Sequence, residues 1–261
     1  MTSSPRPSLL SLVLGTLFGS LHVLFGSLFW GGMAVAMGWH PRRRAMMSRF
    51  ARCWSRGQLL ASGVDLQVRF TAPLDPTARY VFLANHASYL DIPAVLASAP
   101  LPVRIAAKKS LFKIPIFGWS LRVGGFIPID REDRSKATGA FNQALDLLSK
   151  GDSVLFFPEG TRSRDGRLAP FLRGGLLLAL KEGLPVVPVG IRGAYQVQPR
   201  HRWSPQPGPI EVTWGTPIDV KAYGVRRRAE ITALVRRQIL GAVGCEDAAP
   251  EQTAGQGRVV E

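Results

Sequence analysis

A histidine and an aspartate stand five positions apart, directly after a short apolar run in the first half of the chain. They belong to the block Asn85-His86-Ala87-Ser88-Tyr89-Leu90-Asp91. An imidazole suits a general base near pH 7, and it needs an acceptor that fixes its tautomer and stabilises the cation. Asp91 could fold back from the first helical turn to be that acceptor. Ser88-x-x-Asp91 also fits a capping box, in which case Asp91 only caps a helix and His86 is a satisfied core residue.

A second block with polar chemistry reads Phe157-Pro158-Glu159-Gly160-Thr161-Arg162-Ser163-Arg164. It also follows an apolar run, so we expect it at the same sheet edge, where ligands bind to α/β proteins. Gly160 allows a tight turn with exposed amides, and Arg162 is a fork-shaped donor suited to phosphate. Glu159 could position a substrate hydroxyl or hold Arg162. Positive charge is added by Arg164, Arg167 and Arg173. The alternative is an exposed charged turn with internal ion pairs.

Two further segments are candidates for the surroundings of this site. Gly124-Gly125-Phe126-Ile127-Pro128-Ile129-Asp130-Arg131 ends on an arginine that could also face phosphate, or could pair with a neighbouring acid. Leu184-Pro185-Val186-Val187-Pro188-Val189-Gly190 is an apolar strand that could line an acyl pocket. Composition alone favours plain core for this second segment.

The N-terminal segment from Ser8 to Trp39 contains no Asp, Glu, Lys or Arg. A helix of this length reaches roughly 48 Å, against a bilayer hydrocarbon core of about 30 Å. It could be one tilted span, or a pair of helices that dips into one leaflet and bends near Gly26 or at Gly31-Gly32. A cleaved signal peptide is the other alternative, but the apolar run is too long and the leading charge too sparse.

The charge distribution predicts an anionic partner. Lys and Arg number 33 against 18 Asp and Glu, a net charge of +15. The chain has no sequence signature of a nucleic-acid-binding motif, and its apolar N-terminus favours an anionic membrane surface. Six arginines follow the apolar segment, at positions 42, 43, 44, 49, 52 and 56, so the positive-inside rule places the rest of the chain in the cytoplasm. Phe50, Trp54 and Leu60 among them suit a helix lying on anionic headgroups, or else an ordinary solvated basic loop.

The periodicity of the rest of the chain alternates between strands and helices. Strands are expected at 64–70, 80–84, 103–107, 126–129, 153–157, 186–191 and 210–214, and helices at 88–98, 108–123 (broken), 135–150, 173–182 and 226–243. This pattern predicts an α/β fold with a mixed or mostly parallel sheet flanked by helices. We expect three parts: an N-terminal membrane segment with its basic stretch at 1–60, the α/β domain at 61–244, and a disordered tail at 245–261.

In their order and separation, the four blocks resemble the four motifs of the 1-acyl-sn-glycerol-3-phosphate acyltransferases, over roughly Val64 to Trp214. The resemblance implies that His86 takes the proton of the acceptor hydroxyl and that Asp91 orients it. The implied acceptor site comprises Arg131, Glu159, Gly160, Thr161 and Arg162, with Pro188 shaping its apolar side. One departure stands out: family members often have a lysine where Leu172 follows Phe171, and Arg173 is the expected substitute.

The implied activity is transfer of an acyl chain from a thioester, acyl-CoA or acyl carrier protein, to the free sn-2 hydroxyl of lysophosphatidate, giving phosphatidate. The active site would face the cytoplasm from the cell inner membrane. No cofactor or metal is expected, and the chain has no G-x-S-x-G elbow for a covalent acyl-enzyme. Alternatives are the same chemistry on another acceptor (a lyso-aminolipid, another lysophospholipid or glycerol-3-phosphate), or a non-enzymatic, membrane-tethered protein that binds anionic lipid.

Overall fold

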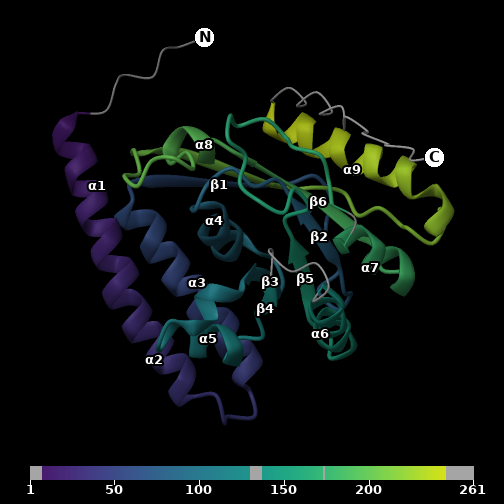
Figure 1. Cartoon of the computed structure of the whole chain (residues 1–261), viewed down its shortest axis with the longest axis horizontal. Helices are drawn as coiled ribbons and strands as arrows, with labels where there is room; N and C mark the ends of the chain where they lie inside the picture. The colour runs from purple at the N-terminus through teal and green to yellow at the C-terminus, as the bar shows by residue number, and fades with distance from the viewer. Residues whose placement is uncertain (1–7, 130–136, 173, 245–261) are drawn as a thin grey trace, which may run out of the picture.

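A mostly parallel sheet forms the centre of the fold (Figure 1). The structure, a computed structural model, describes residues 8–129, 137–172 and 174–244. Over these residues the sheet has seven strands in the order β1-β7-β6-β2-β5-β3-β4, and β6 and β7 are the one antiparallel pair. The strands are β1 Val64–Phe70, β2 Val81–Ala84, β3 Val103–Lys108, β4 Ile127–Ile129, β5 Ser153–Phe156, β6 Val186–Arg192 and β7 Gly208–Trp214. The expected fold class is therefore confirmed.

Helices cover both faces of the sheet because its central strands are apolar on both faces, as parallel strands usually are. On one face, Phe82 and Leu155 pack into a core shared with α3, α4, α5 and α8. On the other, Val81 and Val154 pack into a second core with α6, α7 and α9. These helices are α3 Arg43–Ala61, α4 Asp91–Ser98, α5 Phe117–Val123, α6 Ala137–Ser149, α7 Gly174–Glu182, α8 Ala194–Val197 and α9 Arg228–Val243.

The apolar N-terminal segment is one continuous helix. It comprises α1 Leu9–Leu21, a π-helical turn at His22–Gly26, and α2 Ser27–Ala36. It has 28 residues, and its most apolar 18-residue stretch has a mean hydropathy of 1.9, so by length and composition it could cross a membrane. Of the two expected forms, the single helix is the one observed, and Gly31-Gly32 lies inside α2 without a break. The one irregular stretch within this helix is the π-helical turn at His22–Gly26.

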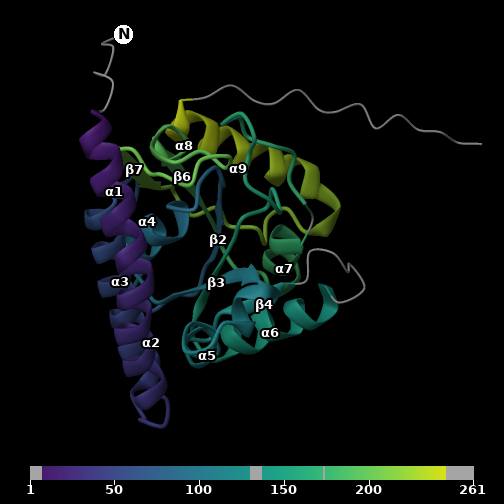
Figure 2. The same ribbon diagram turned by 60° about the vertical axis from the view of Figure 1, so that its left-hand side comes forward.

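The basic segment after this helix is itself helical and returns alongside it as α3 (Figures 1 and 2), which also packs against α4 (Figure 1). Trp54 Nε1 donates to Ser27 Oγ at 3.2 Å, and the Phe50 ring lies 5.8 Å from that of Trp30. Two of the three apolar residues expected on headgroups thus pack on the apolar helix instead, and only Leu60 is exposed. The basic stretch is thus a helix, one of the two forms expected, and it also reaches the core through Leu59.

The His22 ring connects the two antiparallel helices. Its Nε2 lies 2.9 Å from the carbonyl oxygen of Trp54 in α3. A methyl group at Gly26 would come within 2.8 Å of the ring, and one at Gly57 would overlap it. The two glycines therefore form the slot that lets the imidazole lie between the helices.

Candidate functional site

The polar site lies where the carboxyl ends of β2, β5 and β6 meet. β2 pairs in parallel with both β5 and β6, so the residues that follow these strands are brought together. Asn85, directly after β2, donates its amide to the carbonyl of Ile191 at 2.9 Å and accepts from the Ile191 N–H at 2.7 Å. Ser163 N–H donates to the carbonyl of His86 at 2.8 Å. The blocks around His86 and Glu159 thus form one site, as their positions after strands predicted.

The imidazole of His86 and the carboxylate of Asp91 form a buried pair. His86 Nδ1 lies 2.7 Å from Asp91 Oδ2, and the same oxygen accepts from the backbone N–H groups of Ala87 at 2.7 Å and Ser88 at 2.8 Å. Asp91 therefore orders the turn before α4 and also contacts the ring. It does not act only as a helix cap, because the N-cap of α4 is Leu90, which makes no side-chain cap. With the Nδ1 proton donated to Asp91, Nε2 is the nitrogen that can accept a proton.

The imidazole is held on its face as well as at its edge. Its ring stacks on Phe157, with centroids 4.1 Å apart and planes at 22°. His86 is 5% exposed and Asp91 is fully buried. The ring therefore has one orientation, as a positioned base requires. Phe157 belongs to the second block of the sequence, but its contact with the His86 ring is not predicted by the sequence pattern.

Glu159 fixes the backbone of this site. One carboxylate oxygen accepts from the N–H of His86 at 2.6 Å and the other from the N–H of Ala169 at 2.9 Å. Burial raises the pKa of Glu159 to about 7, against the opposing effect of these two hydrogen bonds; the charge of Asp91 raises it further and that of Arg236 lowers it. No ion pair between Glu159 and Arg162 occurs in the described part of the chain. Holding Arg162, one of the two roles expected for Glu159, is therefore not what it does here.

The Arg162 guanidinium lies over the ring of Tyr89, 3.4 Å from its centroid. Its Nη1 is buried and has no hydrogen-bond partner among the residues described. Stacking fixes the plane of the guanidinium and leaves a donor for an anion. Gly160, at φ 71°, makes the turn that a residue with a side chain would strain. Thr161 is exposed, with its hydroxyl 3.4 Å from Arg200 Nη1.

Of the expected substrate-binding residues, Arg131 and Arg173 lie outside the described residues, and Pro188 is described but does not face this site. Pro188 is buried in β6, where the strand's alternation puts it on the same face as Val186, against α7 and α9, and opposite Val187 and Val189. The imidazole side is the Val187 face, because Phe157 and Leu90 belong to that core. Pro188 is therefore a core residue, the alternative that composition favoured.

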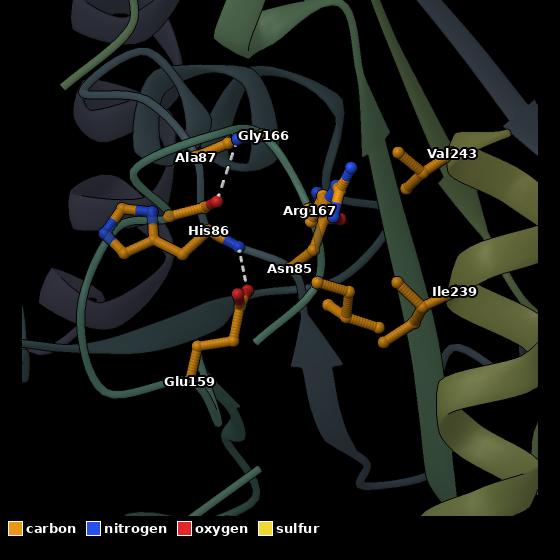
Figure 3. A pocket seen from close by; sticks show the side chains of 10 residues that line it. Asn85, His86, Ala87, Glu159, Gly166, Arg167, Ile239 and Val243 are labelled. Atoms are coloured by element: carbon orange, nitrogen blue, oxygen red, sulfur yellow. Dashed lines mark hydrogen bonds between the residues drawn. The ribbon is translucent and has the colours of Figure 1, made fainter. Parts of the chain in front are cut away.

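A small cavity lies behind the His86 backbone (Figure 3). Its volume is about 10 Å³, and Ile239 and Val243 of α9 close its far side. The imidazole points away from it, so the cavity is not where a substrate meets the ring. Among the described residues, no three His, Cys, Asp or Glu side chains are grouped so that they could hold a metal ion.

Comparisons with known proteins identify relatives of this chain. Residues 65–192 match the family described as Acyltransferase. The 1-acyl-sn-glycerol-3-phosphate acyltransferase of Escherichia coli K12 is 30% identical over 227 residues, 86% of this chain and 85% of that protein. The chloroplastic enzyme BAT2 of Brassica napus is 40% identical over 119 residues, 46% of this chain and 34% of its own length. This chain thus spans about a third of the length of the chloroplast relatives it matches.

A solved structure has the same fold. The crystal structure of the 1-acyl-sn-glycerophosphate acyltransferase from Thermotoga maritima superposes with a TM-score of 0.76 at 26% identity, covering 91% of this chain and 98% of that one. The similarity extends beyond the α/β domain, because 91% of the chain exceeds the residues between β1 and α9.

Proposed function

Since this chain belongs to the 1-acyl-sn-glycerol-3-phosphate acyltransferase family, we propose that it transfers an acyl chain from a thioester donor to the sn-2 hydroxyl of lysophosphatidate. The observation that carries the proposal is the His86–Asp91 pair at 2.7 Å, set at the carboxyl edge of the sheet. A base oriented in this way serves proton transfer, and it would be superfluous in a protein that only binds anionic lipid.

The proposed reaction is direct transfer. Nε2 of His86 accepts the hydroxyl proton as the acceptor oxygen forms a bond to the thioester carbonyl carbon. Asp91 stabilises the resulting imidazolium. The tetrahedral intermediate then breaks its C–S bond, and the leaving thiolate takes the proton from the imidazolium. Base catalysis of this kind contributes about 10²–10⁴-fold to the rate.

Arg162 is the proposed partner of the acceptor phosphate, because its stacked guanidinium keeps an unpaired donor. Gly160 and Thr161 form the turn beside it. Arg131 and Arg173 are proposed to add positive charge from the neighbouring segments. Glu159 acts as a positioning residue, since both of its oxygens bind backbone N–H groups.

The protein is proposed to work at the inner membrane with this site on the cytoplasmic side. The apolar helix 9–36 supports membrane association, and the arginines that follow it support the orientation. The donor is acyl-CoA or acyl-acyl carrier protein. No cofactor is needed for the proposed steps.

The deciding experiment is thiol release by the purified full chain in neutral detergent. Acyl-CoA or acyl-acyl carrier protein is supplied with lysophosphatidate, glycerol-3-phosphate, a lyso-aminolipid or another lysophospholipid. We expect release with lysophosphatidate that is lost in His86→Ala. Activity with a different acceptor alone would reassign the substrate, and activity that persists in His86→Ala would reject the proposed base.

A further inference from the structure

A second cavity, far from His86, has four arginines among its ten lining residues. It has a volume of about 390 Å³, within the range of small-ligand sites. Its charged lining residues are Arg43, Arg44, Arg104, Arg122 and Asp152. The loop after α2, the start of α3 and the ends of α5 and α6 enclose it.

This cavity lies at the opposite end of the sheet from the catalytic site. Asp152 directly precedes β5, and Phe157 directly follows it. A strand of this length separates its ends by about 13 Å. A ligand here would not contact the imidazole of His86, so the cavity is separate from the proposed acceptor site.

The charges of the cavity do not balance among the residues described. Arg104 Nη2 lies 3.0 Å from Asp152 Oδ1, and Arg44 Nη1 lies 3.6 Å from Oδ2 of the same aspartate. Neither Arg43 nor Arg122 has an acidic partner in the described part of the chain. One carboxylate thus faces four guanidinium groups, which favours an anionic ligand.

One donor in the cavity wall is buried and unused. Arg104 is 2% exposed, and its Nε has no hydrogen-bond partner among the described residues. A buried donor without a partner costs free energy, which an acceptor from a ligand would recover. The start of α3 adds to this, since its N-cap, Arg42, makes no side-chain cap. The Arg43 N–H already donates to the His40 carbonyl at 2.9 Å, and the N–H groups of Arg44 and Ala45 are the ones without such a partner among the described residues.

The surroundings of the cavity point to a lipid. It adjoins the end of the apolar helix, where Gly38 packs against Val123 of α5. Trp39 is 78% exposed and Trp119 of α5 is 53% exposed. Exposed tryptophans at the end of an apolar helix are typical of the headgroup level of a bilayer, where basic pockets bind lipid headgroups.

We infer that this arginine-lined cavity binds the phosphate of an anionic phospholipid headgroup, at a site distinct from the one that carries out acyl transfer. Arg104 and the α3 N-terminus contact the phosphate from inside the cavity. Arg43 and Arg122 hold it from the rim, where both are exposed. The bound lipid is a neighbour in the membrane and is neither acceptor nor product.

The test is equilibrium binding of dihexanoyl-phosphatidylglycerol to the full chain in neutral detergent, measured by titration calorimetry. The double variant Arg43→Gln/Arg122→Gln removes the two rim charges without touching the buried Arg104–Asp152 pair. The matched control Arg226→Gln/Arg237→Gln removes two exposed arginines, one in the turn that precedes α9 and one in α9, which lies on the opposite side of the molecule from α2 (Figure 1). Melting temperatures without lipid check that all variants fold.

We expect the rim variant to bind at least tenfold more weakly, and the control and Arg162→Ala to bind as the unaltered protein does. Dihexanoyl-phosphatidylcholine, which has no net charge, should bind at least tenfold more weakly to the unaltered protein.

An equal affinity in the rim variant, or an equal loss in the α9 control, would overturn the site. Loss in Arg162→Ala alone would assign the binding to the catalytic site instead. Inorganic phosphate binding as tightly as the lipid would overturn the lipid as its occupant. None of these readouts depends on acyl transfer.

Discussion

The Glu159 carboxylate accepts a hydrogen bond from the backbone N–H of His86 at 2.6 Å, across 73 residues of sequence. Its second oxygen accepts a hydrogen bond from the backbone N–H of Ala169. One buried acid therefore joins the segment that carries the imidazole to the loop that carries Arg162. The orientation of His86 relative to the arginine depends on this acid as well as on the sheet.

Glu159→Gln should change how stability depends on pH. Burial raises the pKa of Glu159 from 4.5 to about 7, so the folded protein binds a proton more tightly than the unfolded chain. Its contribution to stability is therefore fully present below pH 4.5 and is lost as the pH rises to about 7, by on the order of 3 kcal/mol. Glutamine does not titrate. Thermal unfolding of both proteins in detergent from pH 4.5 to 8 should show the unaltered protein losing stability relative to the variant. A difference in melting temperature that stays constant over this pH range would refute the pKa shift.

Asp91→Asn should lower kcat far more than it lowers the melting temperature. The asparagine oxygen can still accept from the Ala87 and Ser88 N–H groups, but the side chain has no charge to stabilise the imidazolium. We expect kcat to fall about 10²–10⁴-fold, the range of general base catalysis. Asp91→Ala is the contrast, because it leaves buried donors without an acceptor at about 1–3 kcal/mol each. Equal losses of stability in both variants would reduce Asp91 to a structural cap.

Much of this site could be predicted from the sequence because its residues are local to strand ends. His86 and Asp91 are five positions apart, and the non-helical turn before α4 is enough to bring them together. β2 and β5 are apolar on both faces, which is typical of parallel strands. Parallel strands end at the same edge, so the strand pattern predicts that Glu159 lies at the edge where His86 lies. These inferences needed only periodicity and the rule that parallel strands end at one edge.

The partners of Glu159 and Pro188 could not be predicted in the same way. Whether Glu159 binds a side chain or backbone N–H groups depends on how the 160–170 loop folds over β2, which no local pattern specifies. The face of Pro188 depends on the register of β6, and one residue of slip would reverse it. The packing of Phe50 and Trp54 on the apolar helix also arises from tertiary contact, although their amphipathic spacing was visible.

Tyr89 should affect acceptor affinity through its ring and not through its hydroxyl. The ring stacks under the Arg162 guanidinium. Tyr89→Phe keeps that surface and should leave KM for lysophosphatidate within about twofold, as expected for a stacking contact that needs no hydroxyl. Tyr89→Ala should raise KM about tenfold, and Arg162→Ala about ten- to a hundredfold, the loss expected for a charged hydrogen bond. Steady-state kinetics decide this, and similar KM values for Phe and Ala at position 89 would exclude the stacking role.

Gly57→Ala should destabilise the docking of α3 on the apolar helix, because its methyl group would overlap the His22 ring. The ring must then move and give up its contact with the Trp54 carbonyl, at a cost of about 1–3 kcal/mol for overpacking. Gly32→Ala is the matched control, since nothing lies within 4 Å of a methyl there and the change should only add helix propensity. In a His22→Ala background, Gly57→Ala should lose most of its effect on the melting temperature. If the cost were the same with and without the imidazole, the slot between the helices would not be what requires glycine at position 57.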